Sequence, residues 1–199
     1  LTRSIITRMI RSVELRDRYE TKEHAQRVAD ISVELWEAYA ASINLHPKEI
    51  ERNADRLRIA AMLHDVGKLG VSDVILQKPA RLTPEEMAKV REHVLVGAKL
   101  FVDVVSEFDR HARDVALYHH ARWDGTGYPT QAELRQLQEE APQAAGPMLE
   151  PRGENIPLFA RIVALADVFD ALVTPRAYKE AWSVAKALEA IRAEAGRQF

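Results

Sequence analysis

An apolar helical segment ends in ionisable residues within positions 60–70, and this stretch constrains the chain more than any other. Leu57, Ala61 and His64 fall at positions i, i+4 and i+7, which predicts that His64 faces the core. Asp65 points about 100° away from it. The adjacent pair can therefore bind one metal ion from two directions, or two ions side by side. The competing interpretation is a core histidine with an aspartate partner, and for an isolated pair that interpretation is favoured.

Gly67 and Lys68 follow this pair directly. A glycine lets the backbone break and pass close to a neighbouring group. Lys68 supplies a mobile positive charge suited to a phosphate. The stretch thus indicates phosphate chemistry if other metal-binding residues join the pair.

Composition limits the classes of protein that fit. With 199 residues, 47% of them hydrophobic and 29% charged, the chain is long enough for one domain with a full core. No apolar run approaches the ~20 residues that span a bilayer, and no signal peptide opens the chain, so we expect a cytoplasmic protein. The formal net charge of -2 argues against a nucleic-acid partner. Since cysteine is absent, any metal must be bound by nitrogen and oxygen.

Helical periodicity recurs along the sequence without an alternating strand pattern, so we predict an all-α fold. The expected helices cover residues 3–18, 20–42, 47–64, 72–78, 83–105, 109–120, 132–140, 158–173 and 183–196. We expect residues 1–19 to be a connector helix that pairs with another copy or receives a signal from an upstream domain. Residues 20–199 would form one domain, with 130–153 as a surface insertion that could act as a lid. The start without Met suggests a piece of a longer protein.

Histidines recur on the apolar faces and at the ends of these helices. Five of the seven do so, and two carboxylates join them: the set is His24, His64, His93, His119, His120, Asp65 and Asp167. Alone, His24 is more simply a core histidine, and Glu20, one turn before it, a favourable first-turn acid. Burying so many ionisable groups costs free energy if they serve only to pack the core. As ligands of two or three metal ions, all of them are satisfied. Nitrogen and oxygen donors without sulfur suit iron, manganese or zinc more than magnesium or calcium.

A glycine-rich turn follows the double histidine. Residues 122–129 cannot form a helix or a regular strand, and they carry Trp123 and Tyr128 directly after His120. Beyond it, Asp167 and Asp170 lie in a strongly apolar helix, where a carboxylate is costly unless it is paired or binds a metal.

The order of these motifs resembles the HD-GYP domain, a branch of the HD metal-dependent phosphohydrolases that cleaves cyclic di-GMP. The matching segments are 16–24, His64-Asp65 with Gly67-Lys68, His93 with Gly97, His119-His120, Gly127-Tyr128-Pro129, residues 166–172 around Asp167, and Arg176 to Lys179. Lys22, Ala121 and Ala177 depart from the family pattern without removing a ligand, and 130–153 is long for the family. The resemblance implies a compact HD-type helical bundle around a multinuclear metal site.

The resemblance also implies a role for each matched residue. Metal ligands would be His64, Asp65, His93, His119, His120 and Asp167, with Asp65 bridging and catalytic. Glu20 and His24 would add a third ion. Lys68 would neutralise charge on the phosphate as a second catalytic residue, and Arg176 and Lys179 would grip the other phosphate. Tyr128 and Trp123 would shape the guanine side or orient the phosphate. The cofactors would be two or three divalent ions, iron or manganese first, with zinc or nickel as alternatives.

The expected activity is metal-dependent hydrolysis of cyclic di-GMP to linear pGpG, to GMP or to both, in bacterial second-messenger signalling. Two alternatives stay open: a catalytically weak module that binds cyclic di-GMP, and a di-iron oxygenase of HD fold. Lys68 and the turn at 127–129 favour the phosphodiesterase. Expected partners are cyclic di-GMP, an upstream sensor or receiver domain, a diguanylate cyclase of the GGDEF type, and a second copy of the chain.

Overall fold

The computed structural model describes residues 8, 10–13, 15–17, 23–101, 106–145, 150–175 and 180–199. Within these ranges the chain is helical and contains no strand, which confirms the all-α prediction. The elements, in order, are α2 (His24–Ser42), α3 (Pro47–Met62), η1 (Val66–Gly70), α4 (Asp73–Leu76), α5 (Pro84–Arg91), α6 (His93–Lys99), α7 (Glu107–Tyr118), α8 (Gln131–Glu140), α9 (Pro142–Ala145), η2 (Gly153–Asn155), α10 (Leu158–Val173) and α11 (Val184–Ala193). None of the described helices has the length and apolar character that crossing a bilayer requires.

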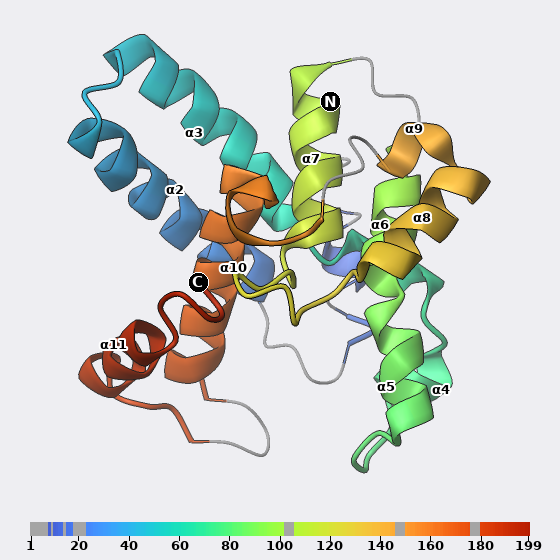
Figure 1. Ribbon diagram of the computed structural model, residues 1–199. Coiled ribbons are helices and arrows are strands. Elements are labelled where there is room, and N and C mark those ends of the chain that lie inside the picture. The colour runs from blue at the N-terminus through green and yellow to red at the C-terminus, as the bar shows by residue number, and fades with distance from the viewer. Residues whose placement is uncertain are drawn as a thin grey trace.

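The main core lies where four helices meet. Helices α2 and α3 form a hairpin, α7 packs against α3, and α10 packs against both α2 and α7 (Figure 1). The residues between them are small or branched, as Ala29, Leu57, Val115 and Val163 illustrate, and all four are fully buried. Small side chains let these helices approach closely, so the polar ends of α3 and α7 come near the middle of α10.

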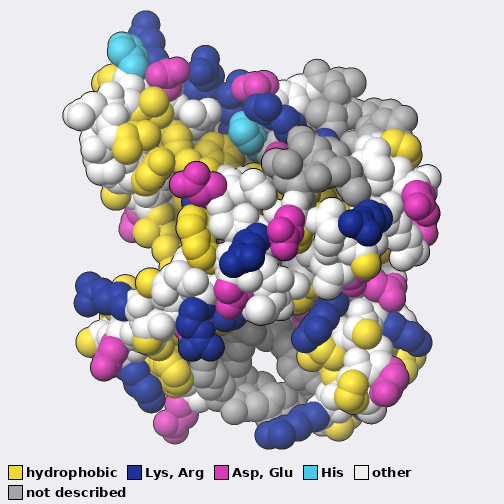
Figure 2. Space-filling model, in the orientation of Figure 1, with side chains coloured by type: hydrophobic (Ala, Val, Ile, Leu, Met, Phe, Trp, Pro, Cys, Tyr) yellow, Lys and Arg dark blue, Asp and Glu magenta, His cyan; other side chains and the backbone are white. Residues whose placement is uncertain are grey.

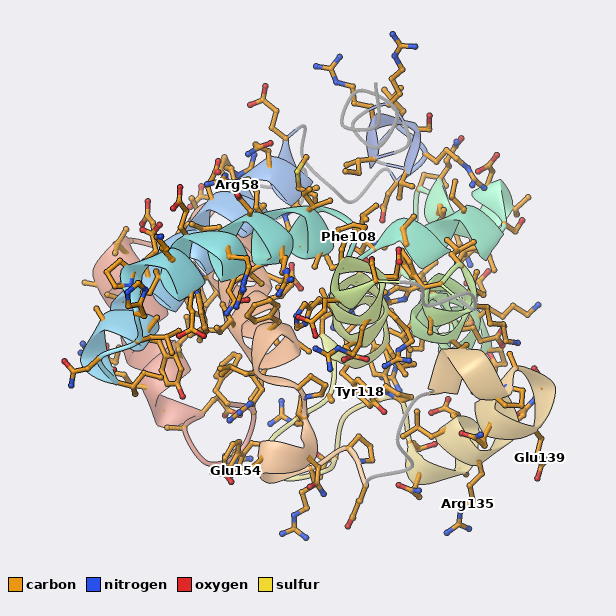
Figure 3. All side chains as sticks on the ribbon, turned by 90° about the horizontal axis from the view of Figure 1, so that it is seen from above. Arg58, Phe108, Tyr118, Arg135, Glu139 and Glu154 are labelled. Carbon is orange, nitrogen blue, oxygen red and sulfur yellow. The ribbon has the colours of Figure 1, made fainter. Side chains whose placement is uncertain are left out.

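A second core joins α8 to the rest of the molecule. Leu134 and Leu137 of α8 are buried against Leu117 and Tyr118 of α7. Figure 3 shows Tyr118 pointing inward, whereas Arg135 and Glu139 on the other face of α8 point outward. The segment predicted as a surface insertion therefore contributes buried core residues, and its role as a lid stays a prediction.

Several helix boundaries differ from the sequence prediction, and three of these differences bear on the site. Residues 15–16 form a turn, so the first helix does not continue to residue 18. Helix α2 starts at His24, because Glu23 has left-handed backbone angles (φ 65°). The helix predicted over 83–105 starts at the Thr83 capping box as expected, but it divides into α5 and α6 at Glu92. At this break His93 Nδ1 donates to the Val90 carbonyl at 2.7 Å, and that carbonyl also accepts a backbone N–H at the end of α5.

Figure 2 shows basic and acidic side chains intermingled over the described part of one face.

Candidate metal centre

Seven ionisable side chains converge where α2, α3, α6, α7 and α10 meet. They form two donor sets, and within each set one donor atom per residue lies within 4.8 Å of the others. The first set is Asp65, His93, His119 and His120, and the second set is His24, His64 and Asp167. Every sequence-predicted metal ligand that the structure describes belongs to one of the two sets.

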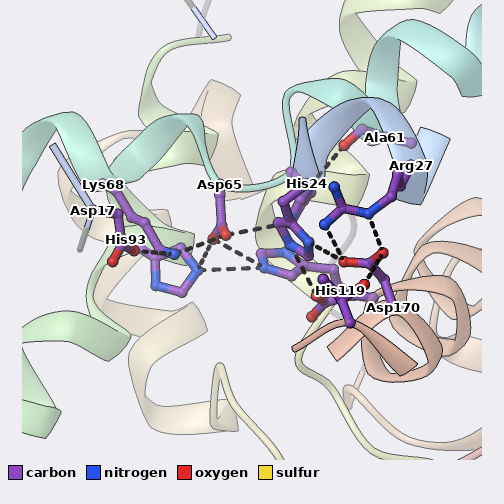
Figure 4. A network of polar contacts seen from close by, with 12 residues as sticks. Asp17, His24, Arg27, Ala61, Asp65, Lys68, His93, His119 and Asp170 are labelled. Atoms are coloured by element: carbon purple, nitrogen blue, oxygen red, sulfur yellow. Dashed lines mark hydrogen bonds and ion pairs between the residues drawn. The ribbon is translucent and has the colours of Figure 1, made fainter. Parts of the chain in front are cut away.

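Asp65 lies between the two sets, and its two oxygens face different ways (Figure 4). Its Oδ1 is 3.1 Å from His93 Nε2 and 3.7 Å from His119 Nε2, both in the first set. Its Oδ2 is 3.2 Å from His64 Nε2 in the second set. Adjacent His64 and Asp65 therefore serve different donor sets, as two ions bound side by side would require.

The histidines are held so that Nε2 faces the centre. In three of them Nδ1 donates to a main-chain carbonyl about one turn back: His64 to Ala61 at 2.7 Å, His93 to Val90 at 2.7 Å, and His119 to Val115 at 3.0 Å. This contact fixes the ring and the tautomer, and it leaves an unprotonated Nε2 as a metal donor.

The facing nitrogens indicate that these donors fit a cation. Because both Nδ1 atoms donate hydrogen bonds, the Nε2 atoms of His93 and His119 each carry a lone pair, and they lie 3.3 Å apart. Two lone pairs at this distance repel each other unless a proton or a metal ion lies between them. His64 Nε2 and Asp65 Oδ1 are buried without a hydrogen-bond partner among the residues described. A buried polar atom left in this way costs about 1–3 kcal/mol. Divalent ions would satisfy all four atoms.

Electrostatics keeps most of the centre in its metal-binding protonation state. Burial raises the pKa of Asp65, but Lys68 and His64 outweigh burial, and the pKa lies well below its ordinary value. The pKa of Asp167 is likewise low, because the His24 hydrogen bond outweighs burial. Burial lowers the pKa of His119, and burial with His119 alongside lowers that of His120 further. His64 differs, since Asp65 outweighs burial and raises its pKa. Ionised carboxylates and neutral imidazoles are the forms that bind metals.

His24 is oriented by a carboxylate that the sequence analysis did not place in the site. Its Nδ1 lies 2.7 Å from Asp170 Oδ2, while its Nε2 lies 3.3 Å from Asp167 Oδ1. Asp170 is 1% exposed and accepts two bonds from Arg27, at 2.6 and 3.0 Å, and one from Thr174 at 3.0 Å. The sequence signal was the cost of a second carboxylate in this apolar helix, but its partners His24 and Arg27 come from a helix more than 140 positions away.

Replacing Asp170 with asparagine should loosen His24 and weaken metal binding at the second set. Removing such a supporting carboxylate typically lowers metal affinity 10–100-fold. Arg27, whose side chain is 33% exposed, would also lose its charged acceptor, and a hydrogen bond to a charged group typically contributes about 1.5–3 kcal/mol, so we expect the free energy of unfolding to fall by about 2 kcal/mol. Chelator competition and thermal denaturation measure the two effects.

Asp30→Asn is the matched control for this variant. Asp30 lies on the same helix as His24 and pairs with Arg58 at the surface, where an ion pair contributes ~0–1 kcal/mol. Metal affinity in Asp170→Asn equal to that of the control would contradict the assignment.

Lys68 is fixed between two carboxylates. Its ammonium lies 2.7 Å from Asp17 Oδ2 and 2.9 Å from Asp65 Oδ2, and its side chain is 12% exposed. The sequence predicted a mobile charge, and this detail is wrong because a buried Asp17, far along the chain, anchors it.

Gly67 permits the close packing that brings His64-Asp65 up to His93. A Cβ at Gly67 would lie 1.9 Å from the His93 carbonyl oxygen and 2.4 Å from the Gly97 nitrogen. Both are backbone atoms and cannot move aside as a side chain can. Gly97 in turn lies against Ala116 of α7, so the two glycines bring η1, α6 and α7 together.

We therefore expect Gly67→Ala to separate α6 from the His64-Asp65 turn. Overpacking of this kind typically costs 1–3 kcal/mol, and here the clash is with backbone, so about 3 kcal/mol of unfolding free energy should be lost together with bound metal. Gly70→Ala, whose Cβ would lie nearest to side-chain atoms of Val96, should lose less. Denaturant unfolding and metal analysis of both variants measure this, and equal losses would contradict it.

Tyr128 borders the first donor set. Its ring lies 4.7 Å from the His120 ring and 6.3 Å from the His93 ring. Burial, with Asp65 adding to it, raises the pKa of the phenol, so the hydroxyl stays protonated. Tyr128, His119, His120 and Asp167 share a cavity of about 390 Å³.

Trp123 lines a different, apolar cavity of about 210 Å³ with Phe199 of the C-terminal segment. Its predicted contact with guanine stays a prediction. Glu20, Arg176 and Lys179 lie outside the described residues, so the structure says nothing of their predicted roles.

Comparison with known proteins agrees with this geometry. The sequence pattern of the HD domain matches residues 21–172, and a second HD domain pattern matches residues 146–199. The chain belongs to the HD domain family. It is 35% identical over 197 residues to the cyclic di-GMP phosphodiesterase response regulator RpfG of Xanthomonas campestris pv. campestris, covering 99% of this chain and 45% of that protein. It is 39% identical over 189 residues to a cyclic di-GMP phosphodiesterase of Vibrio cholerae, covering 90% and 34%.

A third relative is the 3'3'-cGAMP-specific phosphodiesterase 2 of Vibrio cholerae, 33% identical over 198 residues, which cover 100% of this chain and 33% of that protein. The chain thus spans one third to less than half of these relatives. Together with the ordered motifs, they place it in the HD-GYP branch of the HD family. The crystal structure of the phosphodiesterase PgpH HD domain of L. monocytogenes shares the fold at 19% identity (TM-score 0.55), covering 93% of this chain and 79% of that one.

Proposed function

We propose that this HD domain is a metal-dependent phosphodiesterase that hydrolyses cyclic di-GMP to linear pGpG, to GMP or to both. The observation that carries the proposal is the pair of neighbouring donor sets with Asp65 between them, since its Oδ1 faces His93 of the first set and its Oδ2 faces His64 of the second. Relatives named for the cleavage of cyclic di-GMP or of 3'3'-cGAMP support the choice of a cyclic dinucleotide.

The donor chemistry suits two divalent ions, iron or manganese first, with zinc or nickel as alternatives. We assign Asp65, His93, His119 and His120 to one ion, and His24, His64 and Asp167 to the other, with Asp65 shared. When bound, such ions polarise phosphoryl oxygens and lower the pKa of an attacking water. The resemblance gave His24 to a third ion together with Glu20, whereas we now propose His24 for the second ion because its Nε2 lies 3.3 Å from Asp167 Oδ1. Glu20 precedes His24 by four positions, and we retain it as the ligand of a third ion.

The side chains around the donors position the substrate. Lys68, held against Asp65, places a fixed positive charge where negative charge develops on the phosphate. Tyr128 presents a protonated hydroxyl and an aromatic ring beside His120. Arg176 and Lys179 are proposed to bind the second phosphate, and Trp123 to shape the guanine side.

The proposed setting is bacterial second-messenger signalling in the cytoplasm. An upstream sensor or receiver domain, a GGDEF-type diguanylate cyclase and a second copy of the chain remain predicted partners. The division into a connector helix, residues 1–19, and a catalytic domain, residues 20–199, also remains a prediction.

The test is metal analysis combined with product chromatography on anaerobically purified protein. At least two ions per chain and metal-dependent conversion of cyclic di-GMP to pGpG or GMP are expected. Metal-loaded protein that binds cyclic di-GMP without cleaving it would contradict the proposal. Cleavage should stop on chelation and return on addition of the same metal, which excludes a contaminating hydrolase with another requirement.

A further inference from the structure

Arg91, the last residue of α5, lies over the ring of Tyr128. Its guanidinium carbon is 5.3 Å from the ring centroid, and its side chain lines the same 390 Å³ cavity as His119, His120 and Asp167. None of the family motifs identified in the sequence includes it. No carboxylate in the described part of the chain forms an ion pair with it.

Other charged groups of this cavity are already engaged. Arg122 pairs with Glu194 at 3.0 Å and also donates to Gln198 and Thr126. Glu133 accepts the Thr130 backbone N–H at 2.6 Å as part of the α8 capping box. Arg91 is thus a charged side chain of the cavity with its donors available to a ligand.

The described residues form a ring contact with Arg91 but no hydrogen bond to its N–H groups. A guanidinium over an aromatic face gains a cation–π attraction and keeps its forked N–H groups for a planar partner. Tyr128 is itself backed by the His120 ring at 4.7 Å and an interplanar angle of 34°. Arg91 therefore packs on Tyr128, and Tyr128 packs on His120 of the first donor set, so the three side chains connect this set to the cavity wall.

We propose that Arg91 recognises a guanine base of the substrate through its O6 and N7 atoms. Guanine presents these two acceptors side by side, the partner that arginine binds in a bidentate manner, whereas adenine presents an N6 donor next to N7. Arg91 would then be a specificity-determining residue that favours guanine in the cyclic dinucleotide. This inference rests on the proposed function, since it assumes a cyclic dinucleotide substrate.

The test compares cyclic di-GMP with its analogue in which both guanines are 7-deazaguanine and so lack N7. Metal-loaded wild type should cleave cyclic di-GMP with a kcat/KM about tenfold above that of the analogue. Arg91→Met should lower kcat/KM for cyclic di-GMP about ten- to hundredfold and lose the preference between the two substrates, with unchanged metal content. Arg135→Met, an exposed arginine on the outer face of α8, is the matched control and should match wild type (Figure 3).

The outcomes separate this inference from the function it rests on. Wild type that cleaves neither substrate overturns both proposals. If wild type is active, then Arg91→Met with wild-type kcat/KM, or with the guanine preference intact, overturns the role of Arg91 alone. Arg91→Lys adds a second check, because lysine keeps the charge but not the fork. Full recovery of kcat/KM in this variant would show that charge suffices, and would contradict recognition of the base.

Discussion

Replacing Asp65 with asparagine is expected to abolish cleavage of cyclic di-GMP and to remove most of the bound metal, while a folded helical protein remains. The substitution preserves side-chain size but removes the charge that faces both donor sets, at 3.1 Å from His93 and 3.2 Å from His64. We expect turnover to fall by at least about 10³-fold. Metal content by elemental analysis, circular dichroism and product chromatography measure the three effects.

Asp114→Asn controls for the loss of one partly buried carboxylate. Asp114 has a similarly low exposure, 17% against 13% for Asp65, but it pairs with Arg113 on α7 and belongs to neither donor set. It should retain metal and activity. Full hydrolysis with unchanged metal content in Asp65→Asn would overturn the assignment of the whole centre.

Most of the described candidate centre was predictable from the sequence because the histidines carry helical periodicity. Leu57, Ala61 and His64 share the buried face of one helical segment, as their spacing predicts, and His93 and His119 follow the same rule at other helix ends. A residue that is polar, titratable and on an apolar stripe must be satisfied inside the fold. For five such histidines, metal binding is the one interpretation that satisfies all of them together.

Partners across the fold were not predictable in the same way. Asp167 and Asp170 lie three positions apart in one apolar helix, and both are costly there unless satisfied. The sequence did not indicate that Asp170 faces His24 and Arg27, because that depends on the rotation of α10 against α2. The sequence also did not indicate the break between α5 and α6 at Glu92.

The packing of α8 illustrates a further limit. Proline and glycine residues around 142–153 predicted an exposed insertion, and local composition alone supports that interpretation. Leu134 and Leu137 are nevertheless buried against α7. Their spacing of three positions predicts one apolar face of the helix. Which element packs against that face depends on the tertiary fold and cannot be read from the sequence of a short helix.

Lys68→Met should keep the metal and lose turnover. An ammonium cannot bind a metal ion, so metal content is expected to stay at the wild-type level. Loss of one charged contact to the phosphate typically costs about 2.7–4 kcal/mol of transition-state stabilisation, a fall of about 10²–10³ in kcat. Steady-state kinetics on metal-loaded protein measures this fall. Loss of metal without a kinetic defect after reconstitution would contradict the role.

The ion pair with Asp17 gives Lys68 a structural role that must be separated from this catalytic one. Asp17 Oδ2 lies 2.7 Å from the ammonium and its side chain is 5% exposed, so Lys68→Met alone leaves a buried carboxylate without that partner. Breaking such a pair typically costs 3–5 kcal/mol of unfolding free energy. Adding Asp17→Asn should recover much of the stability, because the carboxylate charge that Lys68 neutralised is then gone. If Lys68 acts on the phosphate, kcat of the double variant stays as low as that of Lys68→Met. Recovery of both stability and kcat would instead mean that Lys68 serves only to neutralise Asp17.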